Sequence, residues 1–108
     1  MPLLTLFTAP KPFTNPHIRV IQENALRNWQ QLGGDVAVVV IGDEPGIAEI
    51  CAKLNIQHLP DVRCNDMGTP LISSIFDLGR GVNDSPLLAY SNADILFLPD
   101  WIETVRDL

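Results

Sequence analysis

VAVVVI, residues 36–41, is an unbroken run of small and β-branched apolar residues. A strand with one face in water alternates apolar and polar residues, whereas a strand covered on both faces does not, and parallel sheets are built from the second kind. Parallel neighbours are joined by crossover connections, which usually contain a helix. The run therefore predicts a central strand of an α/β fold, with helical segments before and after it.

The segment before this run has the features of a strand followed by a helix. Leu3–Thr8 (LLTLFT) is a short apolar run that ends at the breaker-rich sequence APKPFTNP, and we expect a first strand there. Asn15 is suited to the N-cap of a helix, and Pro16 to its first position, where an N–H would be unpaired anyway. Apolar residues then recur every three or four positions up to Gly33-Gly34, a typical helix end. They are Ile18, Ile21, Ala25, Trp29 and Leu32.

Helices and strands continue to alternate after the run. GDEPG predicts a turn into a helix that contains Cys51 on its buried face, and residues 55–59 form a weak strand candidate. Thr69 and Pro70 have the residue types of a helix start, Leu87–Tyr90 predicts a fourth strand, and residues 99–105 predict a last helix. We therefore predict a Rossmann-like α/β fold with a mostly parallel sheet and helices on both faces. A chain of 108 residues is long enough for one core, so we expect a single domain over residues 1–108.

Composition and charge narrow the possible partners. The net charge of -6 argues against nucleic acid and anionic lipid, because both require a basic surface. We expect no membrane span and a cytoplasmic location, since no apolar run approaches about 20 residues and the N-terminus lacks the basic region of a signal peptide. Cys51 and Cys64 form no CxxC unit, and His17 and His58 lie far from any ligand-spaced partner, so neither a disulfide nor a zinc site is expected.

The ends of the predicted strands indicate where a ligand would bind. In open parallel sheets, ligands bind outside the carboxyl ends of the strands, at the point where the strand order reverses. Residues just past these ends include Thr8, Ala9 and Pro10, then Asp43, and finally Asn92 and Asp94 in the sequence YSNADILF. Carboxylates at such positions either contact a ligand or simply form turns and helix caps. The pattern alone leaves both interpretations open.

Several segments together resemble the nucleotide-sugar-binding half of GT-A-type glycosyltransferases, particularly family 2-like and related nucleotide-diphospho-sugar transferases. They are LFTAPKPF, VVVIGDEPG, HLPDV, NDMGTPLISSIF and, above all, YSNADILF. The last segment is similar to the DxD element of these enzymes, with Asn92 in place of the first aspartate. The resemblance runs along nearly the whole chain and implies a nucleoside diphosphate sugar as ligand.

The same resemblance implies roles for individual residues. Asp94 would hold Mn²⁺ or Mg²⁺, which bridges the carboxylate to the two phosphates, and hard cations of this kind prefer oxygen ligands. Asn92 would contact the ribose or a water of the metal shell, although the loss of its charge weakens metal binding. Asp43 would accept hydrogen bonds from the base or ribose. The backbone of residues 8–10 would line the nucleotide.

An acceptor site and a general base lie after the DxD strand in the resembling family, whereas this chain ends at Leu108. We therefore expect a truncated GT-A half domain, with catalytic residues unassigned and enzymatic activity of the chain by itself left open. The alternative is a non-catalytic α/β binding or regulatory module, with self-association through an exposed side of the sheet. A flavodoxin-like or phospho-receiver domain fits less well, because no acidic pair or Ser/Thr-rich loop follows the first strand.

Overall fold

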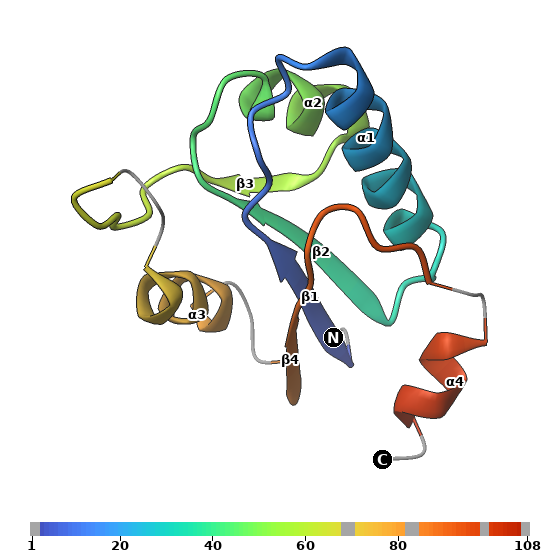
Figure 1. Cartoon of the computed structure of the whole chain (residues 1–108). Coiled ribbons are helices and arrows are strands. Elements are labelled where there is room, and N and C mark those ends of the chain that lie inside the picture. The colour runs from blue at the N-terminus through green and yellow to red at the C-terminus, as the bar shows by residue number, and fades with distance from the viewer. Residues whose placement is uncertain (1–2, 68–70, 82–84, 98–99, 107–108) are drawn as a thin grey trace.

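The computed structural model describes residues 3–67, 71–81, 85–97 and 100–106, and Figure 1 shows one sheet with helices on either side of it. The strands are β1 (Leu4–Thr8), β2 (Val36–Ile41), β3 (Gln57–Leu59) and β4 (Leu87–Tyr90). The helices are α1 (Pro16–Gln30), α2 (Ile47–Leu54), α3 (Ile72–Arg80) and α4 (Trp101–Arg106). Strands and helices alternate along the chain, as the sequence predicts.

The strands form a single parallel sheet in the order β3-β2-β1-β4. Leu4 lies opposite Val36 of β2 on one side and opposite Leu87 of β4 on the other. From β1 the chain adds β2 and β3 outward on one side, and it then returns to place β4 on the other side. The strand order thus reverses between β1 and β4. The Rossmann-like α/β fold predicted from the sequence is confirmed.

Helices cover both faces of this sheet, and each face has its own core. Successive side chains of a strand point to opposite faces, so the unbroken apolar run of β2 contributes to both cores. The core on the side of α1 and α2 includes Leu6, Val40, Leu26, Trp29 and Ile50. The core on the side of α3 includes Phe7, Val39, Ile41 and Ile75.

The start of α1 agrees with the sequence, whereas the helix ends at Gln30, with Gln31 as its C-cap, before Leu32 and the predicted stop at Gly33-Gly34. The side chain of Asn15 accepts the backbone N–H groups of His17 and Ile18 at 2.9 and 3.2 Å, so it is the N-cap, and Pro16 is the first helical residue. The buried residues of α1 are Gln22, Ala25, Leu26 and Trp29. Ile18 and Ile21, two of the regularly spaced apolar residues, are only half-buried and line a pocket.

The third strand is shorter than residues 55–59. Asn55 ends α2 in the left-handed conformation, with φ of 57°, and the N–H of Ile56 donates to the carbonyl of Cys51 at 2.9 Å. Both residues therefore belong to the helix end, and the strand begins at Gln57. Thr69, Pro70 and Pro99, which we predicted near helix starts, lie outside the described residues.

Two further findings concern the cysteines and the helices. Both thiols are free, with Cys51 buried in α2 and Cys64 exposed. Within the described ranges, the protein has no helix with the length and apolar character required to cross a membrane.

Candidate functional site

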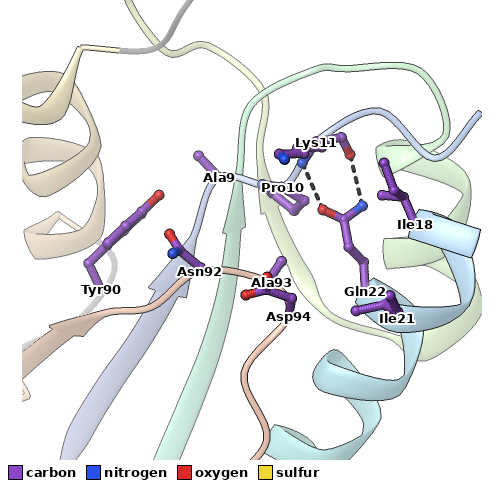
Figure 2. Close-up of a pocket in the computed structure, with 10 residues that line it drawn as sticks. All are labelled: Ala9, Pro10, Lys11, Ile18, Ile21, Gln22, Tyr90, Asn92, Ala93 and Asp94. Atoms are coloured by element: carbon purple, nitrogen blue, oxygen red, sulfur yellow. Dashed lines mark hydrogen bonds between the residues drawn. The ribbon is translucent and has the colours of Figure 1, made fainter. Parts of the chain in front are cut away.

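The carboxyl ends of β1 and β4 lie side by side, and a pocket of about 330 Å³ opens beside them. Figure 2 shows that its residues come from the loop after β1, from α1, and from the end of β4 with the loop that follows. The lining residues are Ala9, Pro10, Lys11, Ile18, Ile21, Gln22, Tyr90, Asn92, Ala93 and Asp94. Four of the predicted site residues therefore meet in one pocket, at the reversal of strand order. They are Ala9, Pro10, Asn92 and Asp94.

A buried glutamine holds the loop after β1. Gln22 is 4% exposed; its side-chain amide donates to the carbonyl oxygen of Lys11 at 2.9 Å and accepts the backbone N–H of Lys11 at 2.8 Å. Pro10 and Pro12 fix the backbone angle φ on either side of Lys11. The two hydrogen bonds and the two prolines therefore restrain this side of the pocket.

The loop after β4 contributes three consecutive residues, Asn92, Ala93 and Asp94, to the lining of the pocket. The N–H of Ser91 donates to the carbonyl of Phe7 at 3.1 Å, which extends the pairing with β1 one residue beyond β4. Ser91 and Ala93 are buried, whereas Asn92 and Asp94 are exposed. Asn92 and Asp94 of this otherwise largely apolar segment thus lie on the side that faces away from the core.

Helix α1 also fixes the continuation of this loop. The indole N–H of Trp29 donates to the carbonyl of Ile95 at 2.8 Å. The side-chain amide of Asn28 donates to the carbonyl of Phe97 at 2.9 Å and accepts its N–H at 2.7 Å. Both loops that flank the pocket are therefore hydrogen-bonded to the same helix.

Thr8 lies below the pocket rather than in its lining. Its side chain is fully buried, and its hydroxyl has no hydrogen-bond partner among the residues that the structure describes. Any contact of Thr8 with a ligand would have to use its backbone, which is the role predicted from the sequence.

Asp43 lies in a second cavity of about 510 Å³, on the carboxyl side of β1 and β2. This cavity shares Ala9, Pro10 and Lys11 with the first pocket, so residues 9–11 border both. Gly42 precedes Asp43 with φ of 111°, a left-handed conformation that favours glycine. The N–H of Gly42 donates to the carbonyl of Leu59 at 2.9 Å, and Nε2 of His58 donates to the carbonyl of Gly42 at 2.6 Å. The exposed carboxylate of Asp43 therefore extends from a fixed turn.

The donors in the first pocket suit a hard cation only in combination with a ligand. Asp94 and Asn92 offer carboxylate and amide oxygens, the atom type that Mg²⁺ and Mn²⁺ prefer. In the described part of the chain, no group of three or more His, Cys, Asp and Glu side chains is placed to hold a metal ion. Mg²⁺ often binds through one or two carboxylates, with phosphate oxygens and waters completing its shell. A divalent ion at Asp94 fits this second mode.

Lys11 and Gln22 are among the six pocket residues that were not predicted as site residues. Lys11 lies within the segment LFTAPKPF, for which the resemblance implies no role of the lysine, and Gln22 lies between the apolar positions Ile21 and Ala25 of the predicted helix. The available signal for Lys11 was a cation between two prolines directly after a strand end. Gln22 gave no comparable signal, because its burial depends on a partner in another segment.

Comparisons with protein-family models, with curated proteins and with solved structures found no match for this chain. The fold and the pocket define a Rossmann-like domain with a polar site at the reversal of strand order. The relation to GT-A-type glycosyltransferases stays a prediction.

Proposed function

We propose that the pocket at the carboxyl ends of β1 and β4 binds a nucleoside diphosphate sugar, as the donor site of a GT-A-type glycosyltransferase. The observation that carries the proposal is the placement of Asn92 and Asp94 in a pocket at the reversal of strand order. An aspartate that merely stabilises a turn is expected to accept a hydrogen bond. Asp94 makes no side-chain hydrogen bond or ion pair with another described residue, which favours a ligand as its partner.

In this proposal Asp94 holds Mg²⁺ or Mn²⁺ together with oxygens of the two phosphates. The ion would neutralise phosphate charge in a protein whose own net charge is -6. Asn92 would donate its amide N–H to the ribose or accept a hydrogen bond from a water bound to the ion. Its neutral side chain adds no second carboxylate, so we expect weak metal binding without the nucleotide.

The nucleoside would occupy the second cavity, where Asp43 accepts hydrogen bonds from the base or ribose. This arrangement is supported by the shared border of the two cavities, since the backbone of Ala9 and Pro10 would contact both parts of one ligand. The proposal concerns donor binding. Sugar transfer additionally requires an acceptor site and, for an inverting reaction, a general base.

A second candidate function is that of a partner-binding module, for which self-association is the simplest case. Strand β4 is at the edge of the sheet, and large apolar side chains near it are exposed, with Tyr90 at 42%, Phe76 at 41% and Leu96 at 64%. An open apolar edge can pair with another strand. Sedimentation showing only monomer at high protein concentration would exclude self-association through β4.

Calorimetric titration of UDP and GDP, with Mn²⁺ and with EDTA, tests the donor site. We expect binding of at least one nucleotide that is tighter with Mn²⁺ in the wild-type protein. Asp94→Ala should remove the gain from Mn²⁺, whereas Asp61→Ala, a change of an exposed aspartate outside both cavities, should keep it. Absence of binding by the folded wild-type protein under both conditions would refute the proposal.

A further inference from the structure

The proposed ligand brings negative charge to an acidic pocket. Asp94 lines the first pocket, and Asp43 and Glu44 line the second cavity. One divalent ion at a single carboxylate leaves part of the charge of a diphosphate unbalanced. A positively charged group of the protein at this place would therefore strengthen binding.

Lys11 is such a group. Among the described residues it is the only lysine or arginine that lines either cavity, and it lines both. Its side chain is exposed and forms no ion pair within the described ranges. Three other cations have carboxylate partners. They are Arg27 and Lys53, which pair with Glu23, and Arg63, which pairs with Asp77.

The backbone of Lys11 is more constrained than that of an ordinary loop lysine. The buried amide of Gln22 bonds both its N–H and its carbonyl, as Figure 2 shows. Pro12 restricts Lys11 to extended conformations, because a residue before proline is disfavoured in the helical region. The next residue, Phe13, donates its N–H to the carbonyl of Pro45 at 2.7 Å. The starting point of the lysine side chain is thus fixed at the border of the two cavities.

We propose that Lys11 binds the diphosphate of the ligand, from the loop after β1, and that Gln22 is the positioning residue that holds Lys11 in place. Asp94 and the divalent ion would act from the loop after β4. The inference rests on the proposed function for the identity of the nucleotide. It predicts that diphosphate binding persists in part when divalent ions are removed.

Inorganic diphosphate is the probe that tests Lys11 separately from the nucleoside. Titration calorimetry in EDTA compares the wild-type protein with Lys11→Ala, Lys11→Arg and the matched control Lys53→Ala, which removes a lysine outside both cavities. We expect Lys11→Ala to weaken binding about tenfold or more, the usual effect of losing a hydrogen bond to a charged group. Lys11→Arg should retain binding within about threefold, and added salt should weaken wild-type binding more than Lys11→Ala binding.

A double-mutant cycle tests whether Gln22 acts through Lys11. Gln22→Met keeps the length and apolar stem of the side chain but makes neither hydrogen bond to the Lys11 backbone. We expect it to weaken diphosphate binding severalfold in the wild-type background and to have no further effect in Lys11→Ala. Equal effects of Gln22→Met in both backgrounds would refute the positioning role.

The outcomes separate the two proposals. Absence of diphosphate binding by the wild-type protein, or equal binding by wild type and Lys11→Ala, would overturn the role of Lys11 even if UDP or GDP binds. Loss of diphosphate binding in Lys11→Ala, combined with no binding of UDP or GDP by wild type, would support Lys11 as an anion-binding residue and overturn the nucleotide site.

Discussion

Two threonines of β1 differ in a way that predicts opposite effects of the same substitution. Thr5 and Thr8 are both 0% exposed. The hydroxyl of Thr5 is hydrogen-bonded to that of Ser85 at 2.8 Å, whereas the hydroxyl of Thr8 has no partner in the described part of the chain. A change to valine preserves the branched shape and replaces the hydroxyl by a methyl group. We expect Thr8→Val to stabilise the protein and Thr5→Val to destabilise it.

The size of each effect follows from the burial. Leaving a buried hydroxyl unpaired costs about 1–3 kcal/mol, and burying a methyl group instead contributes about 0.8 kcal/mol. Some of this gain is lost to imperfect packing, so we expect Thr8→Val to raise the free energy of unfolding by about 1–2 kcal/mol. For a domain of this size, each 1 kcal/mol raises Tm by roughly 4–8 °C. Thr5→Val should lower the free energy of unfolding by about 1 kcal/mol, because the Ser85 hydroxyl loses a partner.

Urea unfolding followed by tryptophan fluorescence measures both changes, and an unchanged dependence on urea would show that stability rather than compactness has changed. Trp29 is fully buried and is expected to report the transition. If Thr8→Val destabilises as much as Thr5→Val, the Thr8 hydroxyl has a partner in solution and the reasoning is wrong. Because Thr8 would contact a ligand only through its backbone, nucleotide affinity should be unchanged in Thr8→Val.

Two further predictions concern a glycine and the cysteines. Gly46 has φ of 88°, and a Cβ there would lie 2.5 Å from Cβ of Phe13. Gly46→Ala should therefore lower the free energy of unfolding by about 1–3 kcal/mol. The control Gly34→Ala places its Cβ in open space and should change the free energy of unfolding by less than about 0.5 kcal/mol. Burial raises the pKa of the Cys51 thiol from 9.0 to about 11, so a thiol reagent should modify only Cys64 in the native protein and both in urea. The pKa of Cys51 is higher in the folded than in the unfolded protein, so the contribution of the neutral thiol to the free energy of unfolding is complete below pH 9 and is lost as the pH rises toward 11. The free energy of unfolding of Cys51→Ala should lack this decrease between pH 9 and 11.

The fold could be predicted from the sequence because its signals are local. Val36–Ile41 is apolar at every position, and Asn15-Pro16 has the backbone chemistry of a helix start. The end of that helix was predicted too late, because Gln31 rather than Gly33 is its C-cap. The short third strand was predicted too long, because the left-handed conformation of Asn55 and the hydrogen bond of Ile56 to the end of α2 are not visible in residue types.

The candidate site was predictable where it depends on topology and not where it depends on side-chain partners. Asn92 and Asp94 share a pocket with the loop after β1 because strand ends in a parallel sheet meet at one edge. Gln22 is polar and lies on a helix, so a hydrophobic pattern assigns it to the surface. It is buried because the Lys11 backbone satisfies its amide, a contact between segments that periodicity does not encode.

The side-chain amides of Gln22 and Asn28 in α1 have a consequence for insertions and deletions. Gln22 pairs with the loop after β1 and Asn28 with the loop after β4, so the two attachment points are separated by about 9 Å of helix at a rise of about 1.5 Å per residue. One residue added or removed between them would turn one amide by about 100° around the helix axis, away from its loop. Related proteins that keep this pocket should therefore vary in loop length elsewhere while α1 keeps a constant length between positions 22 and 28.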